Sequence, residues 1–453
     1  MGAVDFIIGE MSFCGFSFFK NVMKNISTNK PLDVLKVFSF KGIQMQTFHI
    51  TWITFFFCFF GWFGIAPLMK IVKEDLGLSK AQIGNIIIAS VSATIFARLI
   101  IGRLCDTLGP RITYTWLLAI GSIPVMTIGL ANSYESFLLF RLAISVIGAS
   151  FVITQYHTSA MFAPKIKGTA NAVAGGWGNL GGGVTNMLMP VIFAGFVGAG
   201  YANHDAWRLA MVIPGVILLI MAFVYYKFTK DTPAGNYANI KREAVQKGSF
   251  MSAASDYRTW ILFLAYGACF GIEITFDNVA ALYFTENFSC DLKTAGLLAG
   301  AFGFMNLFAR AIGGIVADKV GNVYGMRGKG WLLAGLLAFE GIGIMLFAQT
   351  GSIVFAVIAM LGFAMFLKMA NGATYAIVPF VDAKNVGSVA GIVGAGGNLG
   401  GVLAGFLFKS ESISYAQAFM YIGIVVAVIG GITALIKFDK QESIVVEPVL
   451  EVA

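Results

Sequence analysis

The sequence predicts an all-α membrane protein with twelve transmembrane helices arranged in two six-helix halves. Of its 453 residues, 58% are hydrophobic and only 12% are charged, and the mean hydropathy is +0.80. A soluble domain carries about 25% charged residues. Apolar runs long enough to cross a hydrocarbon core of ~30 Å recur from residue 48 to residue 437. The second half also repeats motifs of the first in the same order, which predicts a pseudo-twofold axis along the membrane normal.

Twelve apolar segments are the expected spans. They cover residues 48–69, 83–104, 112–131, 136–161, 168–196, 207–228, 258–285, 293–317, 329–349, 352–380, 386–409 and 415–437. The one long polar connection follows the sixth span. The predicted organisation is a cytoplasmic amino-terminal segment (1–47), a first bundle (48–228), a cytoplasmic linker (229–257), a second bundle (258–437) and a cytoplasmic tail (438–453).

Basic residues are unevenly distributed between the two sides of the predicted spans. With the amino terminus in the cytoplasm, the linker residues Lys241, Arg242 and Lys247 lie inside, whereas few lysines, such as Lys70, lie outside. Excess lysine and arginine marks cytoplasmic loops, so both termini are expected inside a cytoplasmic membrane, the inner membrane of a cell. The formal net charge of +8 is then loop charge and does not indicate nucleic-acid binding.

The sequence lacks the residue patterns of an enzyme or a metalloprotein. Its five cysteines are scattered without metal-ligand spacing, and its three histidines form no cluster. It contains no nucleophile–base pair and no phosphate-binding loop. We therefore expect neither a cofactor nor a metal, and a function other than catalysis.

A repeated motif ends the second and the eighth span. Its two copies read Arg98-x3-Gly102-x3-Asp106-x2-Gly109 and Arg310-x3-Gly314-x3-Asp318-x2-Gly321. Each arginine stands eight residues before the aspartate, and therefore roughly 12 Å inside the membrane, near its midplane. Two guanidinium groups at matching depth in opposite halves suit a planar anion. Structural arginines bonded to helix carbonyls or motif carboxylates are the alternative.

Two glycine-rich segments lie inside the fifth and eleventh predicted spans. Their glycines repeat at i, i+3 and i+7, as Gly175, Gly178 and Gly182 and again as Gly394, Gly397 and Gly401. Such stripes let another backbone approach closely, and we expect the partner helices to come from the opposite half. Asn179 and Asn398 interrupt the stripes, and a buried amide needs a partner on another helix, water or a ligand.

The motifs together resemble a known transporter family. The segment 102–111, which reads Gly-Arg-Leu-Cys-Asp-Thr-Leu-Gly-Pro-Arg, is similar to the loop motif of the major facilitator superfamily. The fold of that superfamily is therefore the one expected here. The segments 176–183 and 396–401 are similar to the paired signatures of the nitrate/nitrite porter family. Phe-Gly-Ile-Glu-Ile-Thr-Phe-Asp-Asn at 270–278 and the stretch 371–380 agree with the same family.

The resemblance implies where the substrate binds. In that family the anion lies between the arginines that match Arg98 and Arg310, with the asparagine that matches Asn179 beside it. Aromatic residues hold the faces of the anion, and they match Phe151, Tyr266 and Phe270. Asn398 is the repeat mate of Asn179 and is a further candidate. The loop-motif residues Gly102, Asp106, Gly109, Gly314, Asp318 and Gly321 are implied to act in the conformational change.

Glu273 is the candidate for proton coupling. It lies on the helix face of Tyr266 and Phe270, one heptad from Tyr266. Alternatively, it neutralises a buried cation such as Lys368, which like Glu340 also falls inside a predicted span.

The resulting hypothesis is a secondary transporter of nitrate and/or nitrite, working by alternating access. It would use either nitrate/nitrite exchange or proton symport, as a monomer surrounded by membrane lipid. A transporter of another small anion and a membrane nitrate sensor are the alternatives.

Overall fold

The computed structural model describes residues 30–239, 250–382 and 386–438. Within them, eleven stretches are long and apolar enough to cross a membrane. One of these, Leu292–Ala348, is 57 residues long and contains two spans. Gly325 separates the two with φ 67° and ψ −164°, a conformation that glycine adopts without strain. The prediction of twelve spans is therefore confirmed.

The first half consists of helices α2 to α9. Its elements are α2 (Ile43–Phe63), η1 (Ala66–Leu68), α3 (Met69–Leu76), α4 (Lys80–Leu108), α5 (Pro110–Thr127), η2 (Ile128–Leu130), α6 (Tyr134–Ser145), η3 (Val146–Ala149), α7 (Ser150–Met161), α8 (Pro164–Gly198) and α9 (Asn203–Phe228). Local signals fix their limits. Ser79 and Gln82 form a capping box at the start of α4, and Gly77 ends α3 in the left-handed conformation.

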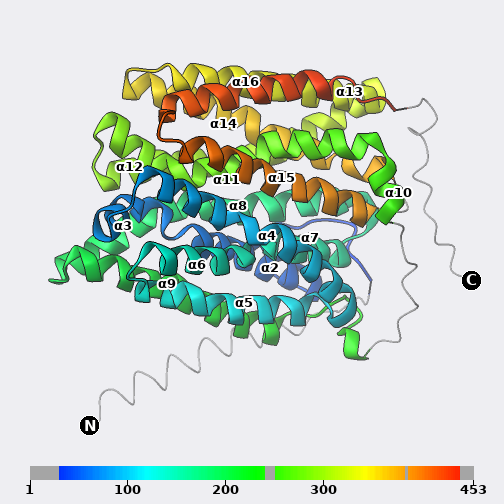
Figure 1. Cartoon of the computed structure of the whole chain (residues 1–453). Helices are drawn as coiled ribbons and strands as arrows, with labels where there is room; N and C mark the ends of the chain where they lie inside the picture. The colour runs from blue at the N-terminus through cyan, green and yellow to red at the C-terminus, as the bar shows by residue number, and fades with distance from the viewer. Residues whose placement is uncertain (1–29, 240–249, 383–385, 439–453) are drawn as a thin grey trace, which may run out of the picture.

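The second half follows the linker elements η4 (Tyr237–Asn239) and α10 (Phe250–Ser255). Its elements are α11 (Tyr257–Phe288), α12 (Leu292–Phe304), η5 (Met305–Leu307), α13 (Ala309–Ala348), α14 (Ile353–Tyr375), η6 (Val378–Phe380), α15 (Val386–Lys409) and α16 (Tyr415–Thr433). In Figure 1 the first half occupies the lower part of the molecule and the second half the upper part.

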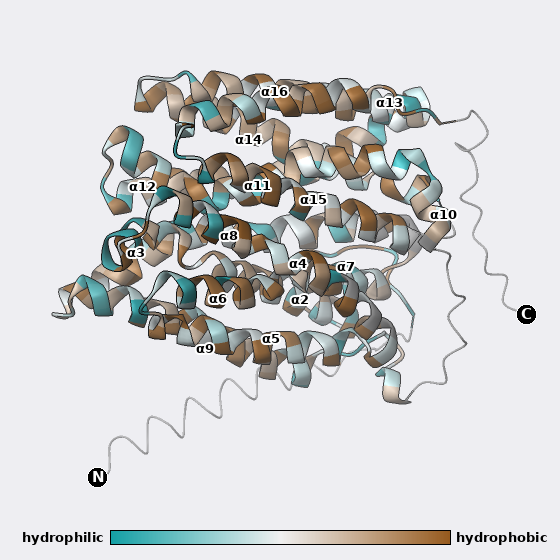
Figure 2. Ribbon diagram, in the orientation of Figure 1, coloured by the Kyte–Doolittle hydropathy of each residue, from teal (hydrophilic) through white to brown (hydrophobic). Residues whose placement is uncertain are grey.

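The outer surface of the bundle is apolar, as a lipid environment requires. Trp116 on α5, Phe223 on α9 and Phe355 on α14 are 61–67% exposed. Figure 2 shows apolar colour along the middle of the outer helices and polar colour at the ends of the bundle, for example at α3. An apolar belt of this kind suits the hydrocarbon core, with the polar ends at the two interfaces.

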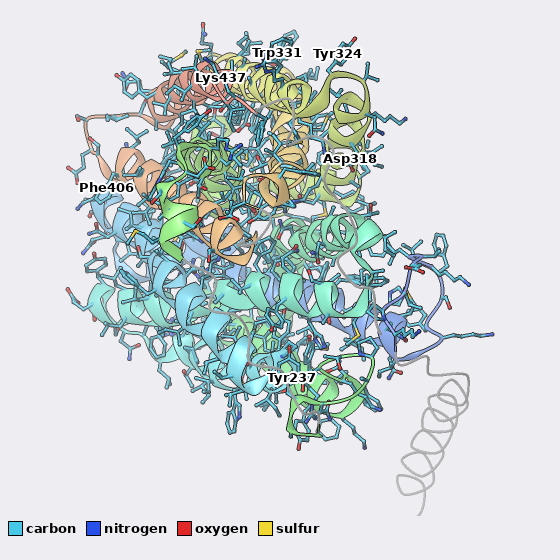
Figure 3. The ribbon with its side chains drawn as sticks, turned by 90° about the vertical axis from the view of Figure 1, so that its right-hand side faces the viewer. Tyr237, Asp318, Tyr324, Trp331, Phe406 and Lys437 are labelled. Atoms are coloured by element: carbon cyan, nitrogen blue, oxygen red, sulfur yellow. The ribbon has the colours of Figure 1, made fainter. Side chains whose placement is uncertain are left out.

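The two ends of the bundle differ in what they contain. Lys73 and Glu286 join the halves at the α3 end through an ion pair of 2.6 Å. The opposite end carries the linker, and we call it the linker end. Viewed from that end in Figure 3, Tyr237 lies with the first half, whereas Asp318 and Tyr324 lie with the second. The second loop motif and the linker therefore share one end of the molecule.

The halves meet where α8 packs on α12 and α4 packs on α15. Gly183 of α8 and Gly303 of α12 stand at the first of these contacts. A Cβ added at Gly303 would overlap the backbone of Gly183. The contact therefore depends on two glycines, which allow the helix axes to come close.

We expect Gly303→Ala to force α8 and α12 apart, lowering both the melting temperature in detergent and the transport rate. Gly335→Ala is the matched control, because a Cβ at Gly335 on α13 meets no atom within 4 Å. Its better helix propensity, worth up to about 1 kcal/mol, should leave the melting temperature equal or higher. A Gly303→Ala protein that melts and transports like the control would contradict this account of the contact.

Candidate functional site

Arg98 and Arg310 lie on opposite halves but face the same aromatic ring. Arg98 belongs to α4 and Arg310 to the first part of α13, and their exposed fractions are 6% and 3%. The central carbon of each guanidinium stands near the Phe270 ring of α11, at 5.8 Å for Arg98 and 6.0 Å for Arg310. The fold thus brings together two arginines that are 212 positions apart in the chain (310 − 98).

Arg98 crosses the interface between the halves. Its Nη1 donates to the carbonyl of Gly394 on α15 at 2.7 Å. With its amide turned so that both groups are satisfied, the Asn398 oxygen accepts from Nη1 at 2.8 Å and from Nε at 3.2 Å. Among the described residues, nothing accepts a hydrogen bond from Arg98 Nη2. Asn398 therefore holds the arginine, leaving one NH₂ group to bind something else.

Arg310 is held in a similar way by its own half. Its Nη2 donates to the hydroxyl of Tyr266 at 3.0 Å, whereas Nη1 has no acceptor in the described part of the chain. Asn179 on α8 is fully buried, and both atoms of its amide are likewise unpartnered among the described residues. A buried polar group without a partner is costly, so these three groups mark places where a polar ligand would be favourable.

Four aromatic residues frame the arginines. Tyr266 and Phe270 are stacked, with ring centroids 5.0 Å apart and planes 3° from parallel. Phe151 of α7 lies 6.4 Å from Phe270, and the central carbon of Arg98 lies 5.4 Å from the Phe151 ring. Tyr375 of α14 closes the group, edge-on to Tyr266 at 5.0 Å. Aromatic rings therefore surround the guanidinium groups.

Tyr375 was not among the site residues predicted from sequence. It lies in the family-like stretch 371–380, so a signal was present. That stretch contains no charge and no second copy in the other half, and periodicity alone cannot show which of its residues reaches the arginines. Only the packing of α14 against α11 places Tyr375 beside Tyr266.

The glycine stripes pack differently from the expectation. Gly397 and Gly401 of α15 lie against Tyr266, Phe270 and Ile274 of α11, which belongs to the same half. Of the stripe residues, only Gly394, which faces Arg98, and Gly182, which faces both Phe59 and Asp277, reach the opposite half. Gly178 packs on Phe55, and Gly175 on Gln155 and Phe151, again within one half. The expectation that the stripes face the opposite half is therefore wrong for four of the six glycines, which face α2, α7 and α11 of their own half.

Glu273 is paired with Lys368. The lysine Nζ lies 2.7 Å from Glu273 Oε1, and both side chains are fully buried. Asn306 donates to Oε1 at 2.8 Å and Asn371 to Oε2 at 2.7 Å, so the carboxylate is well satisfied as an anion. This geometry favours the neutralising role that the sequence left open. Proton coupling at Glu273 stays a prediction.

The loop motifs are built into the linker end. Gly109 has φ 89° between α4 and α5, and Asp231 accepts from the Arg111 amide at 2.8 Å. In the second copy, Lys329 Nζ lies 2.7 Å from Asp318 Oδ1, and Gly321 packs on the same lysine. A Cβ added at Gly102 or Gly314 would meet atoms only at 3.9–4.0 Å, whereas the backbone of Gly314 lies close to Gly372 of α14. The side chain of Asp106 lies outside the described part of the chain. Their part in conformational change stays a prediction.

Comparison with known proteins assigns the family. A model described as Major Facilitator Superfamily matches residues 51–405. The high affinity nitrate transporter 2.5 of Arabidopsis thaliana is 39% identical over 394 residues, covering 85% of this chain and 78% of its own. The chain belongs to the nitrate/nitrite porter family of the major facilitator superfamily.

Two further similarities agree with this assignment. The nitrate/nitrite transporter NrtP of Picosynechococcus sp. is 29% identical to this porter, covering 81% of this chain and 85% of its own. A solved inward-facing, occupied structure of a bacterial homologue of the human lysosomal transporter Spinster has a TM-score of 0.66. That structure is 17% identical and covers 86% of this porter and 95% of its own chain, which supports the fold alone.

Proposed function

We propose that this porter is a secondary transporter of nitrate and/or nitrite. The observation that carries the proposal is the pair of buried arginines at one aromatic ring, each with an NH₂ group that no described residue accepts from. Nitrate and nitrite are flat monoanions whose oxygens accept such hydrogen bonds in the plane of the ion. The faces of the ion suit the rings of Phe151 and Phe270.

The remaining site residues have distinct proposed roles. Arg98 and Arg310 bind the charge, Asn179 adds a neutral donor, and Tyr266 orients Arg310. Asn398 orients Arg98 rather than touching the anion. The anion would move as the two halves rock about this site, between an α3 end facing outward and a linker end facing the cytoplasm. On this proposal both termini lie in the cytoplasm and the protein works as a monomer.

The charge of the site limits how transport is driven. The two arginines carry two positive charges. Glu273, the carboxylate whose charge acts on Arg310, is already paired with Lys368. A bound monoanion therefore neutralises one of two charges, and an empty site is the less stable state in a low-dielectric interior. Exchange of one anion for another avoids the empty site. Symport must return the empty site, and a carboxyl group that has released its proton with the anion then offsets one of the two positive charges.

Counterflow in proteoliposomes tests the function. Vesicles loaded with unlabelled nitrate or nitrite should accumulate ¹⁵N-nitrate transiently, at equal pH on both sides, whereas vesicles loaded with sulfate should not. Imposing an acidic exterior on empty vesicles then measures proton-driven uptake separately. Equal stimulation by internal sulfate, or no stimulation by internal nitrate and nitrite, would contradict the proposal.

A further inference from the structure

Three carboxylates surround one lysine inside the second half. Glu273 and Asp277 stand one turn apart on α11, Glu340 comes from the second part of α13, and Lys368 comes from α14. Glu340 and Asp277 both lie within electrostatic range of Glu273 and Lys368. All four are at most 2% exposed. One lysine can balance only one of the three carboxylates.

The three acids differ in their partners. Glu273 receives the lysine and two asparagine amides. No described residue donates to either oxygen of Glu340 or to Oδ1 of Asp277. An ionised carboxylate without a cation or hydrogen bonds is very costly to bury, and it takes up a proton instead. The partners of Glu273 suit the ionised form, whereas the surroundings of Asp277 and Glu340 suit the protonated form.

Asp277 alone of the two protonated acids lies at the interface between the halves. A Cβ added at Gly182, on α8 of the first half, would stand 3.1 Å from Asp277 Oδ2. Glu340 is enclosed by the second half, because α13 packs chiefly on α14 and α16. Movement of α8 relative to α11 therefore changes what covers Asp277 and leaves Glu340 covered.

The electrostatic surroundings of Asp277 are simple. Lys368 from α14 and Glu273 from α11 itself are the ionisable groups that act on it most. Glu340 approaches the same lysine from α13, and on α8 it is Gly182, which carries no charge, that faces Asp277. Arg141 of α6 reaches the neighbouring Asn278 at 3.2 Å and also binds the Trp62 carbonyl. Lys368 is shared, so Asp277 has no cation of its own.

We propose that Asp277 is the proton-binding site that couples anion transport to the pH gradient. This inference rests on the proposed function and selects symport from its two driving modes. Asp277 lies seven residues beyond Phe270 on α11, roughly 10 Å along the helix from the anion site. A proton bound there enters with the anion and leaves to water once the halves have rocked, so the pair moves without net charge.

Replacement by the isosteric amide separates the two driving modes. Asp277→Asn should keep nitrate counterflow at equal pH within about twofold, and should lower uptake driven by an acidic exterior at least about tenfold. Glu340→Gln is the matched control, since it also replaces a buried protonated carboxylic acid, and it should keep both activities. Asp277→Glu should restore most of the proton-driven uptake.

The outcomes distinguish this inference from the proposed function. Failure of wild-type counterflow overturns the function itself. Normal counterflow without proton-driven uptake in the wild type overturns the inference, as does full proton-driven uptake by Asp277→Asn. If Asp277→Asn does not insert into the membrane, Asp277→Glu is tested instead. In Asp277→Glu, a vesicle-trapped pH dye should report one proton entering with each nitrate. The pH of half-maximal uptake by this variant should also differ from that of the wild type. An unshifted value overturns the inference.

Discussion

Arg98→Lys and Arg310→Lys should each reduce nitrate transport at least about 100-fold while the protein still inserts and folds. Lysine keeps the positive charge but loses the planar guanidinium, whose separate nitrogens bind a neighbouring residue and present an NH₂ group to the anion at the same time. In Arg98→Lys the single ammonium group also cannot bind Gly394, Asn398 and the anion all at once, as the separate nitrogens of the arginine do. Losing two charge-assisted hydrogen bonds costs about 3 kcal/mol, which corresponds to the 100-fold effect.

The measurement is initial ¹⁵N-nitrate uptake per inserted transporter, with the melting temperature in detergent as the test of folding. Arg327→Lys on α13 provides the control, because Arg327 is exposed and lies 17 positions after Arg310 (327 − 310), beyond Gly325. It should transport and melt like the wild type. Near-normal uptake by either site variant would mean that Arg98 and Arg310 are structural arginines, the alternative that the sequence left open.

The paired arginines illustrate what the sequence could predict about the site. Their shared motif fixed the depth of each within its helix, and the repeat placed them in opposite halves. Depth and symmetry together predict convergence, provided that both side chains point inward. The structure brings both to the Phe270 ring. The resemblance also named Phe151, Tyr266 and Phe270, which all lie in the aromatic frame.

The glycine stripes illustrate what the sequence could not predict. A stripe without side chains shows that another backbone comes close, but it carries no information about which helix supplies that backbone. Gly397 and Gly401 meet α11 of their own half, whereas Gly183, outside the stripe, meets Gly303 of the other half. The choice depends on how the helices are arranged around the bundle, which is a property of the whole fold.

The acidic cluster shows the same limit for charges. Spacing along one helix placed Glu273 on one face with Tyr266 and Phe270, but it cannot say which other helix brings a cation. Lys368 stands 95 positions later in the chain (368 − 273), and Glu340 comes from a third helix. Their proximity moves the expected proton site from Glu273, which has a cation, to Asp277, which has none.

Lys368→Met should produce the largest loss of stability among these variants. The methionine fills a similar volume but leaves three buried carboxylic acids without a cation, so Glu273 must lose its ion pair and take up a proton. Removing one partner of a buried ion pair costs about 3–5 kcal/mol. We expect a marked fall in the melting temperature and a low yield of folded protein. Lys73→Met removes the partly exposed ion pair with Glu286 and should cost about 1 kcal/mol or less.

The cluster also predicts an asymmetry between the two partners. Glu273→Gln leaves Lys368 charged, but Asp277 or Glu340 can release its proton and become the new counter-ion, because both lie within range of the lysine. Glu273→Gln should therefore lower the melting temperature less than Lys368→Met does, and the double variant should melt above Lys368→Met alone. If Glu273→Gln instead lowers the melting temperature more, the neighbouring acids cannot replace Glu273 as the counter-ion of the lysine. A single isolated ion pair would then describe this site better than a cluster that shares one cation.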